Sequence, residues 1–235
     1  MKIITTDYGI TYVPFINDEP MSEFAPSWRF FIAHKLLPEI DCNRLKNYLL
    51  SKRSDVLKIK DNLNDGGTGL GNDTTTARYR SYNVLTWDQP DMKMLNEGIA
   101  DMFKKYYNDI VDEPIPSVAF GGWMNIMKRG ERIKRHNHSY SHKCFLSGHF
   151  TVACDDTMTV YTNPYEHWNE DELLQRVEEH GSSYNHSLYT SKNVEGQLTL
   201  FPNYVPHFTT EHRSDSDRIT IAFEIFPNQD FSCPY

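Results

Sequence analysis

Three histidines in the second half of the chain have the spacing of a metal site. His136 and His138 are separated by one residue in the segment GERIKRHNHSYSH. On a β-strand, side chains two positions apart project to the same face, as a chelating pair requires. His207 follows the apolar segment QLTLFP, where a neighbouring strand of a rolled sheet would bring it opposite the pair. Imidazoles bind iron, copper, zinc and nickel, and three protein ligands leave coordination positions open.

An arginine and a threonine downstream of the histidines strengthen the interpretation as a metal site. The chain has ten histidines in 235 residues, so some clustering is expected by chance, and solvated histidines remain an alternative. Eleven residues after His207, however, comes Arg218 in the segment DRITIAFEI, and Thr220 lies on the same face of that strand. A guanidinium and a hydroxyl in this relation can hold a carboxylate by a bidentate ion pair and a hydrogen bond.

The elements that would position these residues are short strands. From Val118 onward, segments rich in β-forming residues alternate with Gly, Pro, Asn and Asp, which is typical of a sandwich or barrel. The expected strands are VAFGGWMNIM, KCFLSGHFTVAC, DTMTVYTN, QLTLFP and DRITIAFEIF. The acidic segment 169–180 interrupts them, and we expect a helix or loop there that covers the mouth of the barrel.

The first half of the chain has a helical pattern. Leu residues recur at roughly helical spacing within residues 30–50, where Asp41 is a plausible N-cap, and residues 91–111 form a second apolar face. We expect one domain over residues 1–235, with a helical and strand support region at 1–117 and a jelly-roll core at 118–228.

Two further segments are candidates for the rim of a substrate site. Residues 65–73, DGGTGLGND, match neither common phosphate-binding glycine motif, so a flexible loop is favoured over a nucleotide site. The second candidate is the segment 165–190, which is rich in Tyr, His and Ser.

Composition limits the function classes. The chain is 39% hydrophobic and 24% charged, as in soluble globular proteins, and contains no apolar run long enough to span a membrane. No secretion signal is recognisable at the N-terminus, so a cytoplasmic location is expected. The net charge of −8 argues against nucleic acid as the main partner. The four cysteines are scattered and are expected to be reduced thiols rather than disulfides.

The segment from Trp123 to Phe226 resembles the iron(II)- and 2-oxoglutarate-dependent oxygenase family related to prolyl hydroxylases. The matching pieces are WMNIMKRGERIKRHNH, LSGHF, TNP, GQLTLFPNYVPH and RITIAF. The resemblance covers slightly less than half of the chain. It implies a double-stranded β-helix (jelly-roll, cupin-like) barrel, mainly β, with N-terminal helices packed on it.

The resemblance also implies an activity and a set of site residues. The expected enzyme is a dioxygenase that uses Fe(II), 2-oxoglutarate and O2 to hydroxylate a peptide, amino acid or small molecule, releasing succinate and CO2. No residue identifies the substrate or the oligomeric state. The implied metal ligands are His136, His138 and His207; the implied 2-oxoglutarate contacts are Arg218 and Thr220 at the distal carboxylate, and Asn125 and Thr151.

One departure from the wider superfamily concerns the middle ligand. That superfamily usually has a carboxylate where this chain has His138, and imidazole raises the net charge of the metal site by one. Sequences of the family that this segment resembles accept HxH, so we retain His138 as the expected middle metal ligand. Asp155, Asp156 and His142 are alternative ligands, in which case His138 would lie beside the metal without binding it.

A cupin-type metal enzyme would use the same three histidines. Gly130 and Gly196 fit the cupin spacing, but His142 stands where the cupin glutamate is expected. Arg218 and Thr220 distinguish the two possibilities, because a cupin has no general need for them.

A jelly-roll module without catalysis, used for binding or assembly, is a further alternative. In that case the histidines are loop residues and Arg218 forms a surface ion pair with Asp215 or Asp217.

Overall fold

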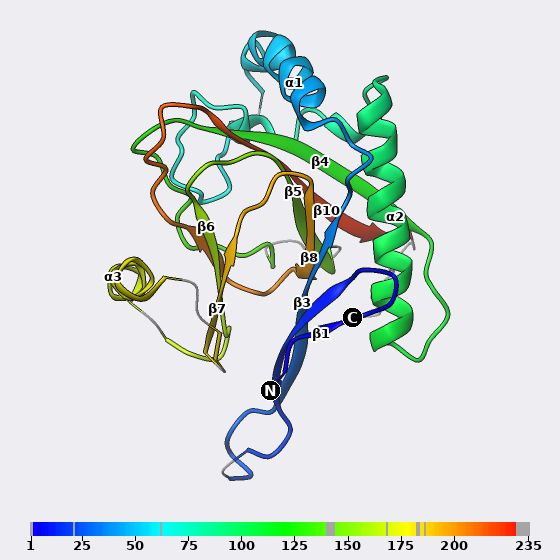
Figure 1. Cartoon of the computed structure of the whole chain (residues 1–235), viewed down its shortest axis with the longest axis vertical. Coiled ribbons are helices and arrows are strands. Elements are labelled where there is room, and N and C mark those ends of the chain that lie inside the picture. The colour runs from blue at the N-terminus through cyan, green and yellow to red at the C-terminus, as the bar shows by residue number, and fades with distance from the viewer. Residues whose placement is uncertain are drawn as a thin grey trace.

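The computed structural model of the chain describes residues 2–20, 22–61, 63–139, 144–167, 169–181, 184–185 and 187–228. Within them, two antiparallel sheets pack against each other and helices lie on the outside (Figure 1). The larger sheet has the strand order β1-β2-β3-β8-β5-β10-β4, and the smaller has the order β7-β6-β9. The strands are β1 Ile4–Thr5, β2 Thr11–Asn17, β3 Trp28–Leu36, β4 Val118–Met127, β5 Leu146–Ala153, β6 Met158–Thr162, β7 Leu188–Lys192, β8 Gln197–Pro202, β9 His207–Thr209 and β10 Arg218–Pro227.

From β4 onward the chain winds between the two sheets. Strands β4, β5, β8 and β10 lie in the larger sheet, and β6, β7 and β9 lie in the smaller one. An isolated antiparallel bridge pairs the backbone of His136 with that of His207, the first residue of β9. The expected strands of this half are therefore confirmed, and β7 and the short β9 are additional.

In the described part of the chain, three α-helices cover the outside of the sheets (Figure 1). They are α1 Cys42–Leu57, α2 Pro90–Ile110 and α3 Glu170–His180, with short 3₁₀ turns η1 at Thr76–Arg78 and η2 at Val84–Thr86. Helix α1 begins where predicted, because the Asp41 carboxylate accepts a hydrogen bond from the backbone N–H of Arg44 at 2.9 Å. Helix α2 confirms the helical pattern of residues 91–111.

Alternate side chains of β10 point to opposite faces of the larger sheet. Ile219, Ile221, Phe223 and Ile225 are buried in one hydrophobic cluster with apolar residues of α1 and α2, on the outer face of the larger sheet. The intervening residues, from Arg218 to Glu224, therefore project to the inner face. Burying an arginine and a glutamate on the inner face indicates that this face surrounds a polar site rather than a simple core.

The helical spacing of residues 30–40 did not lead to a helix. Residues Trp28–Leu36 form β3, which pairs with β2 on one side and β8 on the other. The buried side chains of Phe30 and Ile32 pack with Val13 and Phe15 of β2 in a cluster between the sheets. The apolar run FFIA therefore reflects a strand buried within the sheet, for which periodicity does not distinguish strand from helix.

Helix α3 does not cover the mouth of the barrel. Its Leu173 and Val177 pack on Val160, Leu188 and Phe208, on the outer face of the smaller sheet. The acidic segment was expected to be a helix or a loop, and it is a helix. It packs on the outside of the barrel rather than over its mouth.

Candidate metal centre and its pocket

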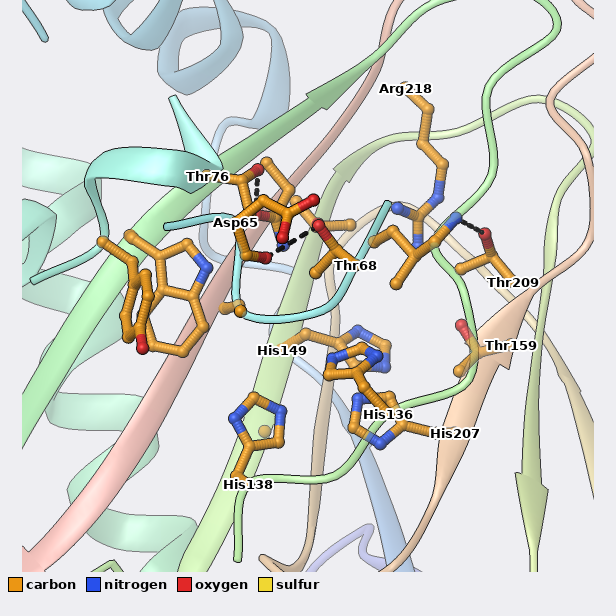
Figure 2. A pocket seen from close by; sticks show the side chains of 18 of the residues that line it. Asp65, Thr68, Thr76, His136, His138, His149, Thr159, His207, Thr209 and Arg218 are labelled. Atoms are coloured by element: carbon orange, nitrogen blue, oxygen red, sulfur yellow. Dashed lines mark hydrogen bonds between the residues drawn. The ribbon is translucent and has the colours of Figure 1, made fainter. Parts of the chain in front are cut away.

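The three predicted histidines lie together between the two sheets. His136 and His138 come from an irregular segment rather than the expected strand, and His207 opens β9. Their candidate ligand atoms all lie within 4.8 Å of one another, and among the described residues this is the one group of three or more potential ligands so placed. Figure 2 shows the three imidazoles gathered on one side of the pocket.

Each imidazole uses the same nitrogen in a hydrogen bond to the protein. The Nδ1 atom of His136 lies 2.8 Å from the carbonyl oxygen of Lys134, and that of His207 lies 3.1 Å from the carbonyl oxygen of Val205. The Nδ1 atom of His138 lies 2.9 Å from a carboxylate oxygen of Glu224. Because carbonyl and carboxylate oxygens only accept, each Nδ1 carries the proton, and each Nε2 keeps a lone pair for a metal.

Burial keeps the rings of His136 and His207 neutral. Removal from water lowers the pKa of His136 to about 4, and the neighbouring His138 acts in the same direction. Burial also holds the pKa of His207 well below its ordinary value, with contributions from His136 and His138. Neutral imidazole is the form that binds a metal, so the donor set fits a divalent cation at neutral pH.

Arg218 lies at the start of β10 and points into the same pocket (Figure 2). Its side chain is 2% exposed, and burial lowers the pKa of its guanidinium. Nη1 lies 3.3 Å from the sulfur of Met127, whereas Nε has no hydrogen-bond partner in the described structure. No carboxylate among the described residues pairs with this buried cation, so its surroundings fit an anionic ligand.

The surface ion pair proposed as an alternative for Arg218 is therefore wrong. Arg218 is buried, and the Asp215 carboxylate instead accepts a hydrogen bond from Arg129 at 2.8 Å. The two aspartates considered as alternative metal ligands are also engaged elsewhere. Asp155 bonds the hydroxyl group of Ser214, and Asp156 bonds the ring of His212. His142, the third alternative, lies outside the described residues.

The other predicted cosubstrate contacts lie in one row across three strands. Thr220 of β10 is paired with Asn125 of β4 on one side and with Thr151 of β5 on the other. Thr220 and Asn125 line the pocket, and the amide oxygen of Asn125 accepts a hydrogen bond from Thr76 at 2.7 Å. Thr151 is buried and its hydroxyl has no partner in the described structure, but it does not line this pocket.

The glycine-rich loop contributes to the pocket wall. Asp65, Gly66 and Thr68 line the pocket, and the Asp65 carboxylate accepts hydrogen bonds from the backbone N–H groups of Gly67 at 3.0 Å and Gly71 at 3.1 Å. These amides are thus occupied by the protein's own anion, which agrees with a loop rather than a phosphate site. No described residue of the segment 165–190 lines the pocket.

Sequence reasoning missed several residues at the site. Glu224 was missed, although its even spacing from Arg218 and Thr220 on one strand was a usable signal. Trp123 was also missed; its ring centroid lies 6.0 Å from that of His138, and Tyr79 packs against it at 5.3 Å. No local pattern would have placed Tyr79 there, because its position depends on the contact between η1 and β4.

Residues 121–224 match the family model described as "Putative 2OG-Fe(II) oxygenase". The match indicates an iron(II)- and 2-oxoglutarate-dependent oxygenase. Iron, 2-oxoglutarate and O2 are accordingly its cofactor and cosubstrates. The family match favours this oxygenase over a cupin-type enzyme or a module without catalysis. A search of curated proteins found none that matches the chain.

Solved structures similar to this chain confirm its fold class. AviO1 from Streptomyces viridochromogenes Tue57 matches with a TM-score of 0.50 at 14% identity, covering 84% of this chain and 90% of that one. The non-heme alpha-ketoglutarate dependent carbocyclase SnoK from nogalamycin biosynthesis matches with a TM-score of 0.52 at 9% identity, covering 83% and 80%. Both similarities support a mainly β jelly-roll.

A more distant match is a Pseudomonas putida prolyl-4-hydroxylase, with a TM-score of 0.41 at 10% identity, covering 60% of this chain and 68% of that one. The chain spans 60% to 90% of the lengths of the first structures that it matches. No helix in the described part of the chain is long and apolar enough to cross a membrane.

Proposed function

We propose that the chain is a hydroxylase in which His136, His138 and His207 hold iron(II) through Nε2. In the same proposal, Arg218 and Thr220 bind the distal carboxylate of 2-oxoglutarate. The supporting observation is that one pocket combines three imidazoles, each hydrogen-bonded to the protein through Nδ1, with a buried guanidinium that has no carboxylate partner in the described structure. Asn125 is proposed as a further contact to the cosubstrate, whereas Thr151, which lies beside Thr220 but outside the pocket lining, is not.

The residues of the chain have distinct tasks in this proposal. When bound, the iron, 2-oxoglutarate and O2 supply the oxidation that introduces oxygen into a substrate C–H bond and yields succinate and CO2. The histidines hold the metal in a fixed position, and Arg218 with Thr220 orients the cosubstrate towards it. Apolar side chains, including Ile133 and Phe201, line the pocket and exclude water, which strengthens the charge interactions inside it.

The proposed substrate is a peptide, an amino acid or another small molecule that enters beside the glycine-rich loop. Asp65 and Thr68 line the pocket there, and Tyr79 with Trp123 supplies an aromatic wall next to His138. We expect the whole chain to act as one catalytic domain. The net charge of −8 disfavours nucleic acid as substrate, and the free cysteines among the described residues favour a cytoplasmic location.

Succinate formation tests this function. The protein loaded with iron(II) is incubated with 2-oxoglutarate in air, with and without a panel of amino acids, peptides and metabolites. We expect slow succinate formation without substrate and a marked increase with the correct substrate class. Arg129→Ala serves as control for Arg218→Ala, because Arg129 is an exposed arginine outside the pocket. Equal succinate formation by these two variants would refute the placement of 2-oxoglutarate.

A further inference from the structure

Glu224 is a buried carboxylate that contacts one of the candidate metal ligands. It lies on the inner face of β10, is 4% exposed, and has Oε1 2.9 Å from Nδ1 of His138. The other two histidines bond backbone carbonyl oxygens at the same atom, so His138 is the one ligand of the three with a charged partner among these Nδ1 contacts.

The contact between Glu224 and His138 places a negative charge beside a pocket that would otherwise gather positive charge. Before 2-oxoglutarate binds, three uncharged imidazole ligands leave the two positive charges of a divalent metal uncompensated, and the Arg218 guanidinium adds another positive charge to the same pocket. Burying positive charge without a nearby anion is costly. A carboxylate that accepts the Nδ1–H of a metal ligand fixes the orientation of the ring and raises the basicity of its Nε2.

We propose that Glu224 is a positioning residue of the metal centre. It holds the His138 ring in the orientation that presents Nε2, and it supplies through the ring the negative charge that the three-histidine ligand set lacks. This inference rests on the proposed function of His138 as a ligand. It assigns to Glu224 a role in metal affinity that is separate from any role in stability.

The test measures cobalt(II) binding by titration, following both affinity and the visible spectrum of the bound ion. Glu224→Gln keeps the shape and an accepting oxygen but removes the charge. We expect it to bind cobalt(II) about 10- to 100-fold more weakly than the unmodified protein, with a changed visible spectrum. Asp91→Asn is the matched control, because Asp91 is also a buried carboxylate but pairs with Arg44, remote from the pocket. It is expected to lower the melting temperature and leave cobalt affinity unchanged.

Testing Glu224→Gln in a protein that also carries His138→Asp shows whether Glu224 acts through its charge or through the fold. In His138→Asp the ligand itself carries the negative charge, so adding Glu224→Gln should cause no loss of cobalt affinity and should relieve carboxylate repulsion. If Glu224→Gln causes an equal loss with and without the His138→Asp substitution, the proposal is overturned in favour of a structural role. An affinity of Glu224→Gln within about twofold of the unmodified protein would overturn it as well.

A third variant keeps the proposal testable if Glu224→Gln does not fold. Glu224→Asp retains the charge but withdraws it from Nδ1, and it is expected to weaken cobalt binding; unchanged affinity in this variant overturns the proposal. If the unmodified protein itself does not bind cobalt(II), the proposed function fails instead.

Discussion

His136 and His207 are joined through their backbones, not only through a shared pocket. The N–H of His136 donates to the carbonyl oxygen of His207 at 3.0 Å, and the N–H of His207 donates back at 2.9 Å. This bridge continues the smaller sheet beside β9 and brings together two residues that are 71 positions apart in the chain. Because the bridge uses backbone atoms alone, a change of either side chain leaves it intact.

The first prediction follows from this bridge. His207→Ala and His136→Ala should fold, with far-ultraviolet circular dichroism like that of the unmodified protein, yet retain no iron(II) after dialysis. The reason is that two imidazoles hold a divalent metal much more weakly than three. Bound metal per chain is the measurement, and His212→Ala, outside the three-histidine group, is the control for loss of an unrelated buried histidine. Full iron retention by His207→Ala would contradict the ligand assignment.

The second prediction concerns the opposite effects of Arg218 on stability and on ligand binding. Arg218→Met replaces a buried cation that lacks a carboxylate partner in the described structure with an apolar chain of similar length. We expect the metal-free protein to become more stable by about 1–4 kcal/mol, as when other buried charges are replaced by apolar residues. Affinity for 2-oxoglutarate should fall roughly 100-fold, because a charge-assisted bidentate contact is lost.

Chemical denaturation and a 2-oxoglutarate titration measure these two effects separately. A variant that is destabilised while its 2-oxoglutarate affinity is unchanged would mean that Arg218 is a structural residue.

The third prediction concerns the glycine of the LSG segment in β5. A Cβ atom at Gly148 would lie 2.3 Å from Cζ of Phe223 and 2.3 Å from the carbonyl oxygen of Thr199, which is backbone and has little room to move. Gly148→Ala should therefore destabilise the fold by about 3 kcal/mol or more, at or above the usual cost of overpacking. Gly121→Ala in β4 is the control, since its Cβ would meet a flexible ring of Phe226 at 3.3 Å. Equal unfolding midpoints would show that β5 and β8 can separate.

The fourth prediction is a loss of stability in mild acid. Burial lowers the pKa of His34 to about 4, and burial together with the nearby Arg218 lowers that of His149 to about 3. In the unfolded chain both titrate near 6.5, so below that pH the unfolded state binds protons that the folded state does not. The contribution of these two neutral rings is fully present above about pH 6.5 and is lost as the pH falls towards 3 to 4.

Urea unfolding of the metal-free protein between about pH 8 and pH 4.5 measures this loss. His136 and His207, whose pKa values are also lowered, act in the same direction. His34→Gln should make the dependence on pH shallower. A slope unchanged by this substitution would mean that His34 does not remain neutral in the folded protein.

The sequence was sufficient to predict much of the barrel and the candidate site, because these features follow from local alternation. A strand places residues two positions apart on one face, so Arg218 and Thr220 were expected together, and the structure brings them to one pocket. The pair His136 and His138 was predicted for the same reason. In the structure their segment is irregular apart from one bridge, and side-chain hydrogen bonds rather than a regular strand orient the rings.

The features that were missed depend on contacts between distant parts of the chain. The residues of β3 were predicted to be helical because an apolar run buried within a sheet resembles a buried helix in sequence. Only the pairing of β3 with β2 and β8 distinguishes a strand from a helix here. The glycine-rich loop at residues 65–73 is held by the buried Arg78, whose guanidinium donates to the carbonyl oxygens of Ile59, Asn72 and Thr74. No local spacing predicts such a contact.

The most direct test of the central claim is the visible absorption spectrum of the protein mixed with iron(II) and 2-oxoglutarate without oxygen. If the three histidines hold iron and Arg218 anchors 2-oxoglutarate beside it, a metal-to-ligand charge-transfer band should appear at one iron per chain. The band should be absent in His207→Ala, and in Arg218→Met it should need far more 2-oxoglutarate. A protein that binds iron(II) but gives no band at saturating 2-oxoglutarate would contradict the account.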